Sequence, residues 1–129
     1  MDTLALVKSW HQHFKMPVVD TPSLPKGRAE MRLAIIEEEV RELREAVEAG
    51  NLVEVLDALC DIQYVVDGTF LEFGLHHLKE HAFSEVHSSN MSKLGDDGQP
   101  ILREDGKVLK GPNFLPPDLA KILDGREVA

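Results

Sequence analysis

The chain contains one cysteine, Cys60, among its 129 residues. A single cysteine excludes an internal disulfide and a thiolate metal cluster, so neither can stabilise this protein within one chain. Cys60 stands in an apolar stretch with helical periodicity. We therefore expect it to be a small buried side chain rather than a reactive thiol.

The first residues lack the marks of a secretory signal. Met1-Asp2-Thr3-Leu4 leads into an amphipathic stretch with Lys8, His11 and His13, without a basic start or an unbroken apolar run. We expect a cytoplasmic protein that does not associate with membranes.

Basic residues are scarce, with 14 Lys and Arg against 23 Asp and Glu and a net charge of −9. This balance argues against a nucleic acid polymer as partner, because such binding requires neutralisation of many phosphates. A free nucleotide remains possible. The acidic excess lies between Glu37 and Asp67, whereas Lys93, Arg103, Lys107 and Lys110 follow later.

Helical periodicity dominates the first 90 residues. The spacing of apolar residues predicts helices at about 4–14, 28–49, 52–73 and 75–89, with a proline-containing loop after the first. Nothing in this part alternates with period two. The sequence therefore predicts an all-α fold, a single domain over 1–129 with a helical core at about 1–90 and a C-terminal arm at 91–129.

The arm has a different pattern. Residues 100–103 and 107–110 flank Glu104-Asp105-Gly106, which predicts a small β-hairpin whose glycine supplies a positive φ. Residues 111–117 should be extended, and a short helix is expected at 118–123 after Pro117. Because such an arm cannot build its own core, it should lie across the helical bundle or a neighbouring subunit.

Acidic residues form the main functional candidate. Glu38, Glu39 and Glu42 share one side of the second helix at about 100° per residue. Taken alone, this run is more typical of a solvated helix face than of a metal site. On the third helix Asp57 and Asp61 share a side among apolar neighbours, which predicts that they do not point into bulk water.

Buried carboxylates need compensation, and oxygen ligands suit a hard divalent ion such as Mg²⁺, which Mn²⁺ can replace. We take Glu38, Glu39, Glu42, Asp57 and Asp61 as candidate metal ligands. A carboxylate that is not fully engaged could accept a proton from an attacking water, and Glu38 and Glu39 are the candidates for that catalytic role. Glu54 lies on the same side but near the helix start, where the helix dipole alone favours an acid.

The sequence lacks the motifs of several other kinds of catalytic site. A di-iron carboxylate bundle needs Glu-x-x-His pairs, and the sequence has none. There is also no Walker loop, nucleophile elbow or zinc-protease motif. The six histidines are more typical of structural or surface positions.

Glu38-Glu39-x-x-Glu42, followed by Asp61 in Cys60-Asp61-Ile62-Gln63-Tyr64, resembles the all-α NTP pyrophosphatase superfamily, which includes MazG-like and phosphoribosyl-ATP pyrophosphohydrolase-like proteins. These proteins often have Glu three residues before the closing Asp, where this chain has Ala58. Asp57 stands four residues before it, still one helical turn away, so we transfer the ligand role to Asp57. The resemblance covers residues 28–95.

The resemblance implies a four-helix, Mg²⁺-dependent unit that forms a dimer or tetramer with shared sites. It would cleave a nucleoside triphosphate, with a deoxynucleoside triphosphate as the main expectation, to the monophosphate and pyrophosphate. Within Ser89–Lys93, Asn90 and Lys93 match a segment that reaches the phosphates in some relatives, and Lys110 is a further candidate. Trp10 could stack on the base, although a helical Trp beside Leu4 and Val7 is more often a core residue.

Three alternatives remain. Two share the chemistry: hydrolysis of phosphoribosyl-ATP, and a dUTPase-like activity that also accepts the diphosphate. The third is a non-catalytic helical interaction module, in which the acidic residues are only solvated.

Overall fold

The computed structural model describes residues 1–125 and is helical throughout its regular parts. In chain order the helices are α1 (Thr3–His13), α2 (Arg28–Glu48), α3 (Leu52–Glu72), the short 3-10 helix η1 (His76–Leu78), α4 (Lys79–Met91) and α5 (Leu119–Gly125). These bounds agree with the predicted ranges to within a few residues, and the all-α prediction is confirmed. Within the described residues, no helix is both long and apolar enough to cross a membrane.

The chain divides into two compact units, Met1–His77 and the residues from Leu78 onward. The first unit contains α1, α2 and α3, and the second contains α4, α5 and the arm between them. The single domain and the four-helix bundle expected from the sequence stay predictions.

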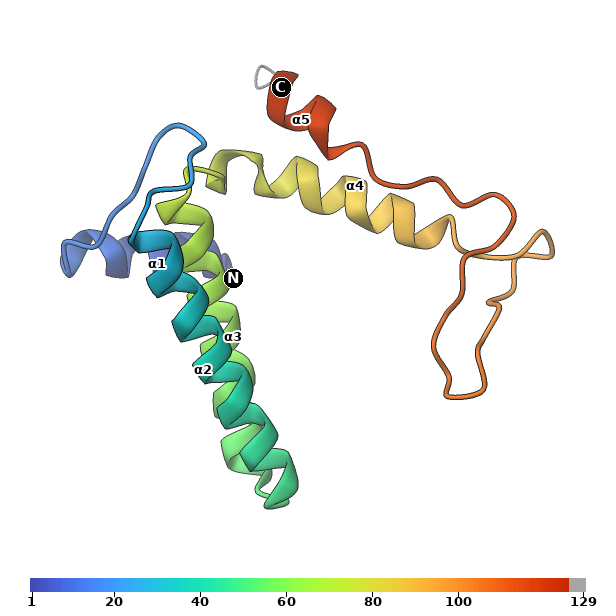
Figure 1. The fold of residues 1–129 in the computed structure, drawn as a ribbon, viewed down its shortest axis with the longest axis horizontal. Helices are drawn as coiled ribbons and strands as arrows, with labels where there is room; N and C mark the ends of the chain where they lie inside the picture. The colour runs from blue at the N-terminus through green and yellow to red at the C-terminus, as the bar shows by residue number, and fades with distance from the viewer. Residues whose placement is uncertain (126–129) are drawn as a thin grey trace. The chain divides into compact units, whose positions relative to one another are not determined.

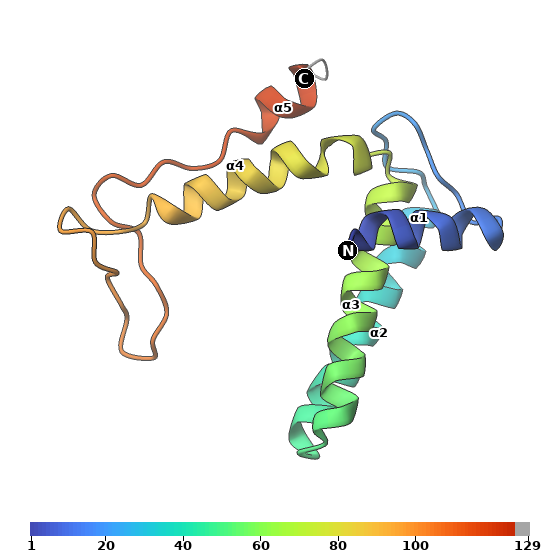
Figure 2. The ribbon, with the colours of Figure 1, turned by 180° about the vertical axis from the view of Figure 1, so that it is seen from behind.

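Helices α2 and α3 form an antiparallel hairpin and lie side by side in both views (Figures 1 and 2). The turn between them is short because its residues suit both helix ends. Gly50 adopts a φ of 65°, which ends α2 without a Cβ penalty. The side chain of Asn51 then caps α3 by accepting a hydrogen bond from the Glu54 amide at 3.1 Å. This tight turn fixes which residues of the two helices face each other.

Helix α1 packs against the C-terminal half of α3. Thr3 donates a hydrogen bond to the buried Asp67 carboxylate at 2.8 Å. The loop that follows α1 is attached to the same end, because the Val19 amide donates to the Leu71 carbonyl at 2.9 Å. The core of the first unit therefore lies around the last turns of α3.

In the second unit α5 lies beside α4, with Ile122 buried (Figures 1 and 2). The predicted turn is present in the arm, and Gly106 has a φ of 89°. The flanking residues form one antiparallel bridge, between Leu102 and Val108, and no strand is assigned within residues 1–125. The hairpin is thus a turn with a single bridge in this chain.

Two burial predictions were wrong. Cys60 is exposed, and so is Asp57. The first half of α3 is apolar around most of its circumference, but α2 covers only one side of it. Leu52 and Val53 are consequently each 79% exposed. The stretch is apolar enough to be buried, but within the first unit α2 is the helix that packs along it, and its other sides are left exposed.

Candidate active site

Three carboxylates from α2 and α3 converge between the two helices. Glu39, Glu42 and Asp61 each offer an oxygen, and these oxygens lie within 4.8 Å of one another. Glu39 and Glu42 are separated by nearly one helical turn, so both point to the same side of α2. Glu39 and Asp61 are half-buried, whereas Glu42 is exposed and leaves the group accessible from solvent. We call Glu39, Glu42 and Asp61 the carboxylate group.

Glu39 is the most perturbed member of the carboxylate group. Its Oε2 atom is buried and has no hydrogen-bond partner. Burial raises the pKa of Glu39, and the negative charges of Glu42 and Asp61 raise it further. A buried anionic oxygen without a donor is costly, and like charges at this separation repel. Both effects would be relieved by a cation at the centre of the group.

The donor set suits a hard divalent ion. Carboxylate oxygens are preferred ligands of Mg²⁺ and Mn²⁺, and the three acids leave room for water or phosphate oxygens as further ligands. The unpartnered Oε2 of Glu39 is the atom that most needs such a partner. Glu39, Glu42 and Asp61 could therefore hold one divalent ion.

The other two predicted ligands lie outside the carboxylate group. Glu38 is exposed on α2, and its charge contributes to the raised pKa of Glu39. Asp57 instead lines a neighbouring polar hollow of about 250 Å³ between the helices, together with Glu42, Glu45, Glu54 and Ala58. Glu42 thus belongs to the carboxylate group and also lines this hollow. The structure brings together three of the five predicted ligands and places Asp57 on the adjoining hollow.

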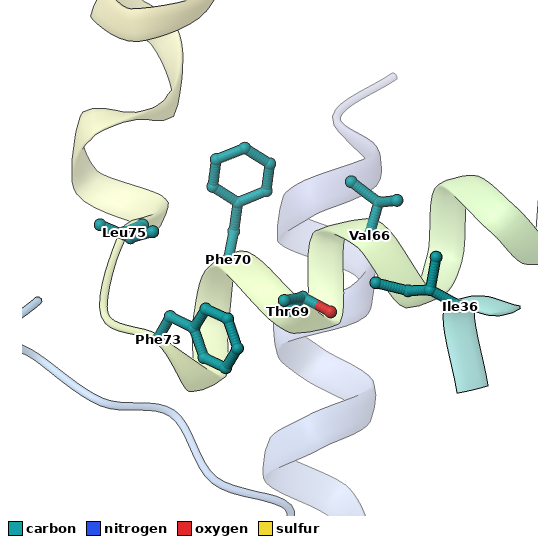
Figure 3. A pocket seen from close by; sticks show the side chains of 6 residues that line it. All are labelled: Ile36, Val66, Thr69, Phe70, Phe73 and Leu75. Carbon is teal, nitrogen blue, oxygen red and sulfur yellow. The ribbon is translucent and has the colours of Figure 1, made fainter. Parts of the chain in front are cut away.

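A second cavity in the first unit is apolar. It has a volume of about 130 Å³ and is lined by Ile36, Val66, Thr69, Phe70, Phe73 and Leu75 (Figure 3). Its one side-chain oxygen belongs to Thr69, whose hydroxyl donates to the Val65 carbonyl at 2.7 Å. Because the lining offers no cation for a phosphate, this cavity is not a candidate for the phosphate-binding site.

The predicted phosphate-binding residues lie in the second unit. Asn90 is exposed near the end of α4. The Lys93 carbonyl accepts a hydrogen bond from the Gly111 amide at 2.9 Å, which brings the segments of Lys93 and Lys110 together. The Lys110 ammonium lies 4.9 Å from the centre of the Phe114 ring. The arm therefore presents two lysines on adjacent segments.

Trp10, the candidate for base stacking, lies on α1 in the first unit. It is 38% exposed, so it is not a core residue. Its ring stacks on Phe14 with centroids 4.6 Å apart and meets Tyr64 edge-on at 6.1 Å. Tyr64 follows Asp61 by nearly one turn of α3. Through Tyr64, the aromatic side chains of α1 thus contact the helix that carries Asp61.

A buried polar network near the end of α3 was not anticipated from the sequence. Glu72 is fully buried and pairs with Arg28 at 2.7 Å and with Arg32 at 2.9 Å. His11 is buried beside this network, and burial lowers its pKa. The available signal was that each charge stands between apolar neighbours, Arg32 between Met31 and Leu33 and Glu72 between Leu71 and Phe73, where opposite charges predict a pair.

Comparison with known proteins identifies relatives of this chain. It is 52% identical over 46 residues to uncharacterized protein L479 of Acanthamoeba polyphaga mimivirus, a match covering 36% of this chain and 18% of the viral protein. The chain thus spans less than a fifth of that relative. A candidate NTP pyrophosphohydrolase from Exiguobacterium sp. 255-15, known from a crystal structure, is 31% identical, with 99% of this chain and 95% of that chain covered and a TM-score of 0.47.

The family model described as phosphoribosyl-ATP pyrophosphohydrolase matches residues 7–90. This range is more than half of the chain and includes α2, α3 and the whole carboxylate group. The resemblance inferred from the glutamate and aspartate pattern is confirmed by this match. The chain belongs to the phosphoribosyl-ATP pyrophosphohydrolase family, within the MazG-like all-α nucleotide pyrophosphohydrolases.

Proposed function

We propose that this protein is a metal-dependent nucleoside triphosphate pyrophosphohydrolase that converts a deoxynucleoside triphosphate to the monophosphate and pyrophosphate. The main support is the convergence of Glu39, Glu42 and Asp61 around the unpartnered Oε2 of Glu39. These residues lie inside the range that the family model matches.

In this proposal the carboxylate group holds Mg²⁺, or Mn²⁺ in its place. Bound there, the ion would neutralise phosphate charge and favour ionisation of a water molecule. The protein contributes the arrangement of the ligands, because Glu39 and Glu42 come from α2 and Asp61 comes from α3. Asp57 would act from the adjoining hollow, where it and Glu42 are both lining residues.

A general base is the second requirement of hydrolysis. Glu38 is exposed, lies next to Glu39 in sequence and is outside the converging group, so its carboxylate is available to accept a proton from an attacking water. Glu39 remains the alternative, because its raised pKa makes proton uptake easier than for an ordinary glutamate. Replacing Glu38 and Glu39 in turn by glutamine tests which of the two carboxylates accepts the proton.

Four further residues are proposed to contact the substrate. Asn90, Lys93 and Lys110 would bind phosphate oxygens, because their side chains supply hydrogen-bond donors and the lysines supply positive charge. Trp10 would stack on the nucleobase through the exposed part of its ring. Shared sites would require the chain to form a dimer or tetramer. Exposed apolar side chains on α3, including Leu52 and Val53, support such self-association.

Phosphoribosyl-ATP is the second candidate substrate, and the description of the matching family favours it. The bond cleaved would be the same, between the α and β phosphorus atoms. A panel of substrates therefore distinguishes the two candidates without a change of assay.

The test is product analysis with the full chain. Ribo- and deoxynucleoside triphosphates, dUDP and phosphoribosyl-ATP are incubated with and without Mg²⁺ or Mn²⁺, and both products are identified. Metal-dependent release of pyrophosphate from a dNTP supports the proposal, and turnover of phosphoribosyl-ATP alone favours the second candidate. Hydrolysis of dUDP indicates the dUTPase-like activity. A chain that turns over none of them contradicts the enzymatic proposal and leaves the non-catalytic module.

A further inference from the structure

Arg32 is a buried cation at the contact between α2 and α3. Its side chain is only 6% exposed. The guanidinium group donates three hydrogen bonds to α3: from Nε to the Thr69 hydroxyl at 3.2 Å, from Nη1 to Glu72 Oε2 at 2.9 Å, and from Nη2 to the Val65 carbonyl at 2.7 Å. One side chain of α2 is therefore bonded to three residues spread over two turns of α3.

These bonds restrict how α2 can move along or around α3. The guanidinium group is planar and its donors point in fixed directions, so three acceptors on one helix define its position and orientation. The acceptors include a backbone carbonyl, which cannot adjust through a rotamer change. A lysine keeps the charge but has a single nitrogen, and it could not make the same three bonds.

The space for this group depends on Gly68. A Cβ atom at this position would lie 2.8 Å from His11 Nε2 and would also collide with Nη2 of Arg32. The His11 ring is itself fixed, because its Nδ1 lies 3.0 Å from the Pro17 carbonyl oxygen. The side of α3 at Gly68 is thus shared by the Arg32 guanidinium group and the His11 ring of α1, and a larger residue there would displace one of them.

The position of Arg32 is coupled to that of Glu39. The two residues are seven apart on α2, which is nearly two full turns, so they face α3 on the same side. On α3, Asp61, Val65, Gly68 and Glu72 are spaced by four, three and four residues and likewise share one face. A shift of Arg32 against Val65 and Glu72 would therefore shift Glu39 against Asp61.

The carboxylate group needs such a constraint because its own charges oppose convergence. Glu39 and Asp61 carry like charges on opposite helices, and Glu39 is partly desolvated. Repulsion would separate the helices at this level if nothing held them. The bonds of Arg32 with α3 provide attraction two turns away, on the same face of α2.

We propose that Arg32 is a positioning residue of the metal site, whose three bonds to α3 set the register that brings the oxygens of Glu39, Glu42 and Asp61 together. This inference rests on the proposed function, because it assumes that these oxygens bind a divalent ion. Arg32 itself would not touch the ion or the substrate.

The test is Mn²⁺ binding to the full chain without nucleotide, measured by calorimetry for the wild type and for Arg32→Lys. Thermal unfolding is recorded in parallel. Arg41→Lys is the matched control, since it makes the same substitution at an exposed residue of the same helix that pairs with Glu45 at 3.8 Å. We expect Arg32→Lys to lower the Mn²⁺ affinity about tenfold, the lower end of the range for loss of a direct partner of a metal ligand, because Arg32 acts on the ligands only through the two helices. Arg41→Lys should keep the wild-type affinity.

A purely structural role predicts another result. The melting temperature of Arg32→Lys would fall, but the molecules that remain folded would bind Mn²⁺ with wild-type affinity, and that outcome would overturn the positioning role. If Arg32→Lys does not fold, Thr69→Val provides the second variant, since it removes the acceptor for Nε and keeps the shape. Unchanged affinity in Thr69→Val would then overturn the inference.

Mn²⁺ binding also distinguishes failure of the proposed function from failure of the role of Arg32. A wild-type chain that shows no saturable Mn²⁺ binding would contradict the metal site itself, and the role of Arg32 with it. Wild-type binding together with unchanged binding in Arg32→Lys would contradict only the role of Arg32.

Discussion

The carboxylate of Glu39 on α2 faces that of Asp61 on α3, and their candidate ligand oxygens lie no more than 4.8 Å apart. The Glu39 oxygen Oε2 is buried there without a hydrogen-bond partner. Two like charges held this close across a helix pair destabilise the chain that contains no ion. The same arrangement strengthens the binding of a divalent cation. A mutation that removes one of these charges should therefore stabilise the metal-free chain and weaken metal binding.

Glu39→Gln should stabilise the metal-free protein at neutral pH. Burial and the charges of Glu42 and Asp61 raise the pKa of Glu39 above its ordinary value of 4.5. Between pH 4.5 and the raised value the folded chain holds more protons than the unfolded chain. The free energy of unfolding therefore falls as pH increases through this interval. Glutamine has no such titration, so the variant should lose this pH dependence.

Thermal unfolding of wild type and Glu39→Gln, in the presence of a chelator and over a pH series, checks this expectation. Glu48→Gln is the control, because Glu48 is exposed on the same helix and outside the carboxylate group. The variant should also lose the stabilisation that Mn²⁺ gives to the wild type. A lower melting temperature of Glu39→Gln at neutral pH in the chelator would show that the Glu39 carboxylate stabilises the metal-free fold.

Asp61→Asn and Asp57→Asn should differ in their effects on turnover. Asp61 belongs to the carboxylate group, whereas Asp57 lines the adjoining hollow. Loss of a ligand should cost several kcal/mol of transition-state stabilisation, which lowers kcat about a hundredfold or more. We expect this loss for Asp61→Asn and a smaller one for Asp57→Asn. Initial rates at saturating Mg²⁺ provide the comparison, and near wild-type turnover of Asp61→Asn would contradict its assignment as a ligand.

Local patterns in the sequence were sufficient to predict the helices and part of the site. Apolar spacing located α1 to α4, because helix amphipathicity depends on residues three and four apart. The Glu-Glu-x-x-Glu spacing and Asp61 likewise included the three acids that converge, although Glu38 of the same pattern lies outside the group. The position of Gly106 in a turn with positive φ was predictable for the same local reason.

Burial was harder to predict because it depends on which other surfaces are present. The apolar residues around Cys60 suggested a buried segment, but α2 covers one side only and Cys60 is exposed. The pair of Arg32 and Glu72 was also missed. Its residues are 40 apart in sequence and come together only through the register of the α2–α3 hairpin, which periodicity alone does not fix.

Trp10 is the single tryptophan of the chain, so its fluorescence reports on one position of α1. If the exposed part of its ring stacks on a nucleobase, binding of a non-hydrolysable nucleotide should change that fluorescence saturably. Trp10→Phe should keep most of the affinity, whereas Trp10→Ala should raise KM with little change in kcat. Free pyrophosphate is the control ligand because it has no base. Identical signals for nucleotide and pyrophosphate would contradict base stacking at Trp10.

Gly68→Ala should destabilise the protein although alanine is the better helix former by about 1 kcal/mol. The added Cβ would lie 2.8 Å from His11 Nε2 and would collide with Arg32 Nη2, so the guanidinium group must leave its place against α3. Forced repacking of this kind costs about 1–3 kcal/mol, which urea unfolding at neutral pH can resolve. The double variant Gly68→Ala with Arg32→Met removes one colliding group. The cost of the alanine should then be smaller than in the wild-type background, and strict additivity would show that the glycine is not required for the placement of Arg32.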